Sequence, residues 1–220
     1  MGFIINPYNF GTAPTYSDTF SAIGSWVEQD STYIGISGGV LNFNNQHDGT
    51  NDATSFDLMG TTISDTKWTL RFKLTWSTIT IGNNIFTGLA FGISSLPSSS
   101  AYSASHDFIG MTKTGQSSST QYFVYGKDGT GLSTGEGTVF TRAPQVETVY
   151  VEIKRISSTS ASMELFSNSS YTTSLEYNTV TVSATTTNLR YIWIGNRDFS
   201  NAATSVTIGS IDDLQFWNNV

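Results

Sequence analysis

The chain has 220 residues, a formal net charge of −7 and no cysteine. Without cysteine it can form neither disulfides nor thiolate metal sites, and its negative charge opposes a phosphate backbone, so nucleic acid is not an expected partner. Aromatic residues make up 13% and charged residues only 12%, with 20 glycines, which is typical of short strands joined by many turns and covered by hydroxyls and amides.

Residues 1–17 are predicted to form an extended arm. Pro7 and Pro14 interrupt regular structure, while Phe3 and Phe10 are apolar side chains that need a surface to pack on. We expect the arm to dock on its own domain or on a neighbour, which allows a homo-oligomer formed through residues 1–17. The start does not have the pattern of a classical signal peptide, and no later apolar run is long enough to span a bilayer, so membrane insertion is not expected.

Residues 18–220 are predicted to form one all-β domain. The clearest strand is 68–76, in which Trp68, Leu70, Phe72, Leu74 and Trp76 alternate with polar residues, as in a half-buried antiparallel strand. No segment has sustained helical periodicity. Further strands are expected at 39–43, 85–93, 108–113, 121–126, 149–156, 162–166, 189–195 and 211–217. The expected fold is an antiparallel two-sheet sandwich.

Several of these segments together resemble the concanavalin A-like lectin/glucanase superfamily, especially its LamG-like members. Asp18-Thr19-Phe20 with Trp26, and then 38–43, resemble the first two strands, and the ending 208–217 resembles the strand that closes such domains beside the first one. Segments 68–76, 149–155 and 191–196 resemble the strands between them. The resemblance spans about residues 18–218 and implies a jelly-roll sandwich.

The superfamily contains lectins, glucanases, adhesion modules and virion proteins, so the resemblance leaves three functions open. The first is a non-catalytic carbohydrate-binding module, displayed on a virion or another extracellular surface, with glycans or other subunits of a surface assembly as partners. The second is a virion decoration or fibre protein that binds no glycan. The third, a glycoside hydrolase or lyase, is disfavoured because the Glu-x-Asp-x-x-Glu strand of the glucanase branch is missing.

No catalytic residue is predicted. Gly131-Leu132-Ser133-Thr134-Gly135 matches the Gly-x-Ser-x-Gly elbow of serine hydrolases. That elbow requires a turn from a strand into a helix, and no helical pattern follows here. A chance match is expected in a chain this rich in glycine and serine.

Two polar segments are candidate glycan-binding sites. Asn196, Arg197 and Asp198 directly follow a predicted strand, and a guanidinium beside an amide and a carboxylate can hold sugar hydroxyls. A solvated loop in which Arg197 pairs with an acid is an equally good interpretation. His47, Asp48 and Asn51 lie in a second loop, which is rich in side-chain donors and acceptors. Ordinary turn chemistry explains the composition of that loop as well.

A structural Ca²⁺ ion is the candidate cofactor. Strand alternation puts Asp212 on the same face as Leu214 and Phe216, so its carboxylate is expected to point inward, where it needs a partner. The superfamily resemblance implies a calcium site where the first and last strands meet, which adds Asp18 as a second ligand. Carboxylate oxygens suit this ion. The alternative is that Asp212 only caps a turn.

Overall fold

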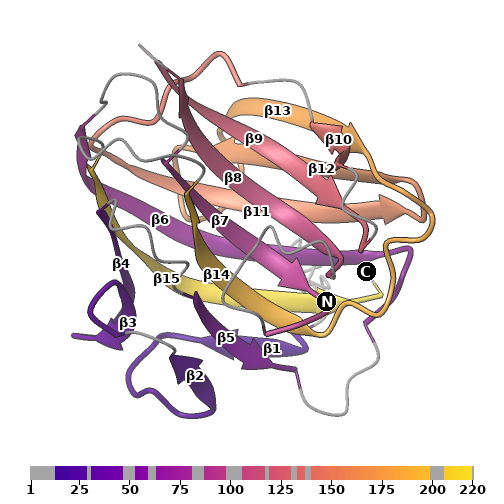
Figure 1. The fold of residues 1–220 in the computed structure, drawn as a ribbon, viewed down its shortest axis with the longest axis horizontal. Coiled ribbons are helices and arrows are strands. Elements are labelled where there is room, and N and C mark those ends of the chain that lie inside the picture. The colour runs from indigo at the N-terminus through magenta and orange to yellow at the C-terminus, as the bar shows by residue number, and fades with distance from the viewer. Residues whose placement is uncertain are drawn as a thin grey trace, which may run out of the picture.

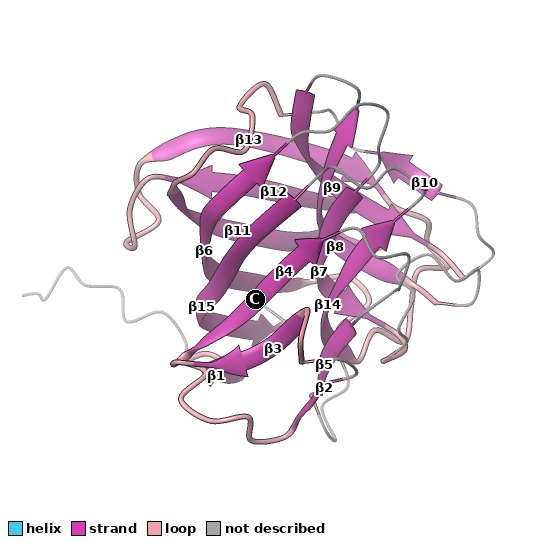
Figure 2. Cartoon of the chain, turned by 60° about the vertical axis from the view of Figure 1, so that its left-hand side comes forward, coloured by secondary structure: helices cyan, strands magenta, loops and turns pink. Residues whose placement is uncertain are grey.

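The computed structural model describes residues 13–28, 31–46, 53–58, 63–80, 87–97, 106–116, 119–129, 133–136, 140–198 and 206–219. Regular structure in these ranges consists entirely of β-strands, and none of them contains a helix that could cross a membrane. The strands form two antiparallel sheets that pack face to face (Figure 1, Figure 2). The predicted all-β sandwich is therefore confirmed.

The first sheet, sheet A, contains the longest strands of the chain. Strand β1 (Tyr16–Asp18) pairs with the end of β15. The order of its other strands is β13 (Ser174–Thr181), β12 (Ser160–Phe166), β11 (Thr148–Ser157), β6 (Trp68–Thr80), β15 (Val206–Asn218), β4 (Val40–Gln46) and β3 (Ile34–Ser37).

The second sheet, sheet B, packs against the first over most of its length. Its order is β10 (Ser133–Glu136), β9 (Ser119–Lys127), β8 (Phe108–Gln116), β7 (Thr87–Ser94), β14 (Tyr191–Asp198), β5 (Ala53–Asp57) and β2 (Trp26–Glu28).

The core between the sheets follows from the alternation seen in the sequence. All five apolar residues of β6 that share one face are buried, as predicted. Phe72 meets Phe91 of sheet B edge to face, with ring centroids 4.6 Å apart. The residues between them, such as Arg71 and Lys73, consequently lie on the outer face of sheet A, which carries the site described below.

The first and last strands of the domain lie side by side, as the family resemblance implied. Asp18 of β1 is in register with Leu214 of β15. Tyr16 and Ser17, which the sequence analysis assigned to the arm, are residues of β1 and so belong to sheet A. Residues 1–12 of the arm lie outside the described residues.

A bulge in β15 overturns the expected orientation of Asp212. The register with β6 shifts between Asp212 and Gln215, and Asp213 adopts a positive φ of 50°. The shift inserts residues into the alternation, so Ile211 and Leu214 are both buried. Asp212 instead lies on the outer face, where its carboxylate pairs with the Lys73 ammonium at 3.5 Å.

Candidate functional site

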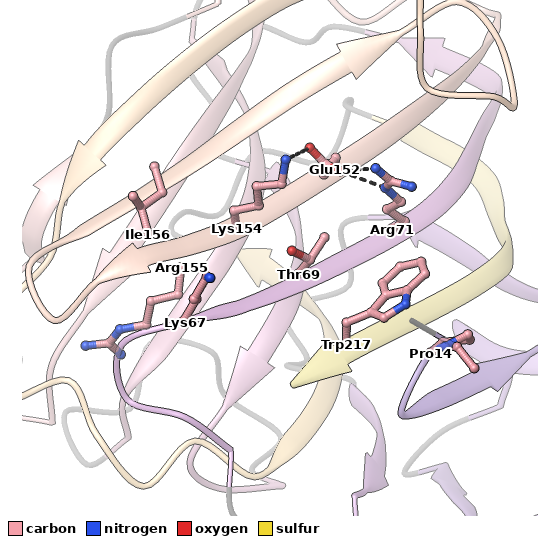
Figure 3. Close-up of a pocket in the computed structure, with 10 residues that line it drawn as sticks. Pro14, Lys67, Thr69, Arg71, Glu152, Lys154, Arg155, Ile156 and Trp217 are labelled. Carbon is pink, nitrogen blue, oxygen red and sulfur yellow. Dashed lines mark hydrogen bonds and ion pairs between the residues drawn. The ribbon is translucent and has the colours of Figure 1, made fainter. Parts of the chain in front are cut away.

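An open pocket of about 590 Å³ lies on the outer face of sheet A (Figure 3). This volume is within the range of small-molecule sites in proteins. The pocket extends across three neighbouring strands of the sheet and reaches the residues just before β1. Its lining consists of Ala13, Pro14, Lys67, Thr69, Arg71, Glu152, Lys154, Arg155, Ile156 and Trp217.

Strand register explains why these side chains meet. Arg71 of β6 is opposite Glu152 of β11, and Thr69 is opposite Lys154, so the four side chains project from the same face of one antiparallel pair. Trp217 of β15 is in register with Thr69 on its other side. The pocket therefore depends on regular strand pairing and not on the conformation of a long loop.

Glu152 occupies the centre of the polar part of the pocket and is only 3% exposed. Its Oε2 accepts a hydrogen bond from Arg71 Nε at 2.6 Å and lies 2.6 Å from Nη2 of the same guanidinium. Its Oε1 forms an ion pair with Lys154 Nζ. A carboxylate with this little contact with water needs such partners, and here each oxygen has a cation.

Two aromatic rings lie against the guanidinium of Arg71. The guanidinium carbon lies 4.5 Å from the centre of the Tyr171 ring and 5.4 Å from that of Trp217. Burial raises the pKa of Tyr171 far above its ordinary value, so this ring stays uncharged at neutral pH. The position of Arg71, and through it that of Glu152, is therefore fixed before any ligand arrives.

The lining carries more positive than negative charge, although the whole chain has a net charge of −7. Lys67, Arg71 and Lys154 together with Glu152 leave two positive charges. Arg155 adds to the lining, but its guanidinium is buried and donates to the carbonyls of Ser157, Ser158 and Thr186 at 2.7–3.2 Å. Within the described parts of the chain, no carboxylate forms an ion pair with Lys67.

A second, smaller pocket of about 300 Å³ lies on the same face and includes Tyr171, the residue that packs on Arg71. It contrasts with the first pocket in charge, because the described part of its lining contains two carboxylates, Asp18 and Asp213, and no lysine or arginine. Its lining consists of Ser17, Asp18, Thr19, Tyr150, Ser169, Tyr171, Asp213, Leu214 and Gln215.

The two segments predicted to bind glycans have different outcomes. Asn196, Arg197 and Asp198 are the last three residues of β14 in sheet B, paired in backbone register with β7, so they belong to a strand and not to a loop that follows it. His47, Asp48 and Asn51 lie outside the described residues. The strand that carries Asn196, Arg197 and Asp198 thus belongs to the other sheet from the pocket described above.

The contacts of Asp18 and Asp212 do not fit a calcium ion shared by the two. The Asp18 carboxylate accepts hydrogen bonds from Tyr16 OH at 2.6 Å, the Phe20 amide at 2.6 Å and Trp26 Nε1 at 2.8 Å. Asp212 faces a lysine. A calcium site needs several converging oxygen acceptors, and the described residues contain no group of three or more histidines, cysteines or acids placed for a metal.

The outer face of sheet B carries a cluster of a different kind. Ala90, Phe108, Tyr125 and Trp193 pack together there, separate from the main core. A Cβ added to Gly195 would come within 2.2 Å of the Trp193 ring, so only glycine lets the indole lie along the strand at this position. Trp193 is fully buried, unlike Trp217 in the pocket of sheet A.

Two glutamates of sheet A are brought together by strand pairing. Glu152 of β11 is directly opposite Glu164 of β12. Glycosidases use a pair of carboxyl groups flanking the substrate, one as an acid and one as a base or nucleophile. Here both oxygens of Glu152 are paired with cations, Oε2 with Arg71 and Oε1 with Lys154.

The pocket was not predicted from the sequence, although two of its strands were. Arg71 is one of the polar residues that alternate with the apolar ones in the predicted strand 68–76, and 149–156 was also predicted to be a strand. The available signal was that charged residues alternate with apolar ones in both strands. The pairing of β6 with β11 could not be deduced from spacing, because the two strands are more than 60 residues apart.

A scan against protein-family models finds no match, and no curated protein sequence matches the chain. Solved structures match in fold. The legume lectin-like domain from Entamoeba histolytica is 11% identical with a TM-score of 0.59, over 94% of this chain and 98% of that one. The CBM2 module of the evolved Dit of Lactobacillus casei BL23 phage J-1 is 10% identical with a TM-score of 0.58, over 94% and 96%.

An enzyme shares the same architecture. The marine PL7 alginate lyase AlyA1 from Zobellia galactanivorans is 15% identical with a TM-score of 0.52, over 86% of this chain and 82% of that one. Identities this low establish the fold alone. The fold is a concanavalin A-like jelly-roll sandwich, which confirms the resemblance seen in the sequence.

Proposed function

We propose that the chain is a non-catalytic carbohydrate-binding module and that the pocket on sheet A is its binding site. The observation that carries the proposal is the combination, in one open pocket, of the Trp217 indole with a preformed set of polar groups around Glu152. A sugar ring has an apolar C–H face and a rim of hydroxyls. An aromatic wall suits the first, and fixed charged donors suit the second.

The rigidity of the pocket supports a binding role. Its polar side chains come from paired strands, and Arg71 is held by an ion pair and by two aromatic rings. Ordering these side chains on ligand binding therefore costs little free energy. Neighbours of the same fold include a lectin-like domain and a phage CBM2 module, which supports saccharide binding as a use of this scaffold.

Display on a virion or another extracellular surface is the finer part of the proposal. Its support is the phage J-1 Dit module, which has this fold over nearly its whole length. The residues before Tyr16 lead into β1, and residues 13 and 14 line the pocket, so an arm that docks on a neighbouring subunit would bring that subunit close to the site. A structural subunit that binds no glycan is the alternative, and a binding assay separates the two.

Binding of the purified chain to an array of oligosaccharides tests the proposal. We expect saturable binding to at least one class of saccharide, and we expect Trp217→Ala to weaken it by about tenfold or more, since the indole contributes a whole wall of the pocket. Tyr177→Ala is the matched control, because it removes an aromatic side chain that is 51% exposed on the same sheet, outside the pocket. Failure to bind any saccharide, or equal binding by the Trp217→Ala variant, contradicts the proposal.

The non-catalytic part has its own test. Incubation with β-glucans, galactans and alginate is expected to release no new reducing ends. Reproducible turnover that Glu152→Gln or Glu164→Gln abolishes would show that the two glutamates act as a catalytic pair, and would place the chain among the enzymes of this fold.

A further inference from the structure

Resting on the function proposed above, we infer that the pocket on sheet A selects acidic saccharides, whose carboxylate or sulfate groups bind between Lys67 and Lys154. The chain has 17 acidic and 10 basic residues, so a site with an excess of cations departs from its average composition. Among the described residues that line this pocket, four are basic, Lys67, Arg71, Lys154 and the buried Arg155, and one is acidic, Glu152.

The basic side chains of the pocket differ in how completely they are already engaged in ion pairs with Glu152. Arg71 donates to Glu152 through Nε and pairs with it through Nη2, so it positions Glu152 and is not the anion-binding group. Lys154 shares Glu152 but is 43% exposed, so its ammonium can contact a ligand as well. Lys67 lies at the exposed end of the pocket and pairs with no carboxylate among the described residues.

Figure 3 shows how these groups surround the open space. Thr69 lies between Lys154 on one neighbouring strand and Trp217 on the other, and Lys67 lies where the chain enters the strand of Thr69. A sugar ring packed against the indole would therefore direct an acidic substituent toward the two ammonium groups, with the Thr69 side chain at the floor. A carboxylate and a sulfate both accept charge-assisted hydrogen bonds from lysine.

The net charge of the chain argues against a general attraction for polyanions. At −7 the protein repels a long anionic polymer, so selective binding has to come from the local excess of cations. At ordinary ionic strength, salt screens charges that lie more than about 8–10 Å apart. Acids elsewhere on the surface therefore have little effect on the attraction between the pocket and an anionic ligand. A short acidic saccharide that fits the pocket is consequently favoured over nucleic acid.

Calorimetric titration of the full chain with matched saccharides tests the inference. Oligogalacturonate carries carboxylates, and its methyl ester has the same sugar rings without the charge. Sulfated and unsulfated dextran oligosaccharides form the second pair. We expect the acidic member of at least one pair to bind about tenfold more tightly than its neutral partner at low salt, and the difference to shrink as salt is added.

Substitution of the two lysines tests whether they cause the selectivity for acidic saccharides. Lys67→Gln and Lys154→Gln are each expected to weaken binding of the acidic probe about five- to tenfold and to weaken binding of the neutral probe several-fold less than that. Arg190→Gln is the charge-matched control, because Arg190 pairs with Asp57 of sheet B and neither residue lines the pocket. Lys67→Gln removes an exposed side chain, so it reports on binding even if Lys154→Gln disturbs Glu152 and the fold.

Each outcome separates the inference from the function on which it rests. Equal binding of acidic and neutral probes, lost in Trp217→Ala, overturns the acidic selectivity and keeps the carbohydrate-binding function. Acidic selectivity that survives Lys67→Gln and Lys154→Gln overturns the assignment to this pocket. The absence of binding by every probe, and by a wider set of saccharides, overturns both.

Discussion

The two faces of strand β6 have opposite roles in the molecule. On the inner face, Phe72 and its apolar neighbours are completely buried and contact the other sheet. On the outer face, Arg71 is one-third exposed and forms part of an open pocket. Both sets of residues come from one stretch of thirteen residues, and a step of one residue along the strand changes the environment from apolar core to solvent-facing site.

Stability and binding should therefore respond to different substitutions in this protein. Substitutions on the inner face should change the free energy of unfolding, and substitutions on the outer face should change ligand affinity. Glu152 is the exception, because it lies on the outer face but is buried under two cations.

The largest effect is expected for Phe72→Ala, which leaves a cavity opposite Phe91 in the core. The free energy of unfolding should fall by about 3–5 kcal/mol. Thr75→Ala on the outer face, which removes a hydroxyl contact with Thr148 Oγ1 at 3.0 Å, should cost no more than about 1 kcal/mol. Urea denaturation of both variants measures the difference. Similar losses in the two would mean that the inner face does not dominate stability.

The next effect is expected for Glu152→Gln, which leaves the guanidinium of Arg71 and the ammonium of Lys154 without their shared carboxylate. We expect a loss of about 1–3 kcal/mol, less than for a fully buried pair because both cations are partly exposed to water. Glu164→Gln on the neighbouring strand should be nearly neutral. If the two substitutions had equal effects, the ion pairs of Glu152 would contribute nothing to stability.

A smaller, pH-dependent effect is expected at the edge strand β13. Burial opposes the charged form of Glu176, but hydrogen bonds from the Thr141 and Arg142 amides and the Thr141 hydroxyl outweigh it and lower the pKa of this carboxyl. A group whose pKa is lower in the folded state stabilises the protein above its unfolded pKa, and the contribution is lost as the pH falls through the folded pKa.

Thermal unfolding of Glu176→Gln between pH 7 and strongly acidic pH tests this prediction. The variant should be less stable than the natural chain by up to about 1 kcal/mol at neutral pH, and the gap should close on acidification. A gap that stays constant down to strongly acidic pH would show that the charge of Glu176 is not involved.

The smallest effect is expected for calcium. Because Asp18 already accepts three hydrogen bonds and Asp212 pairs with Lys73, we expect nearly identical melting curves with Ca²⁺ and with EDTA. An ion that binds the folded state would raise the melting temperature by mass action. A clear rise that Asp18→Asn abolishes would support the calcium hypothesis drawn from the sequence and would contradict the present interpretation of these contacts.

The sequence predicted the fold well where apolar residues alternate, as in β6, because burial on one face imposes a period of two. It missed β13, whose residues are mostly exposed because the strand lies at the edge of its sheet. Asp212 was placed on the wrong face because a bulge breaks the alternation that the prediction relied on. The pocket was missed because Arg71 and Glu152 are joined by a pairing of distant strands, which no local pattern reveals.

The proposed position of the binding site on sheet A is tested most directly by the NMR signals of the tryptophan indole N–H groups during titration with an acidic oligosaccharide. The chain has five tryptophans, of which Trp26, Trp68, Trp76 and Trp193 are 0–4% exposed, while Trp217 lines the pocket. We predict that the Trp217 signal shifts with ligand concentration while the other four stay in place. A saturable shift of the Trp193 signal with that of Trp217 unchanged would place binding on sheet B and contradict the assignment of the site.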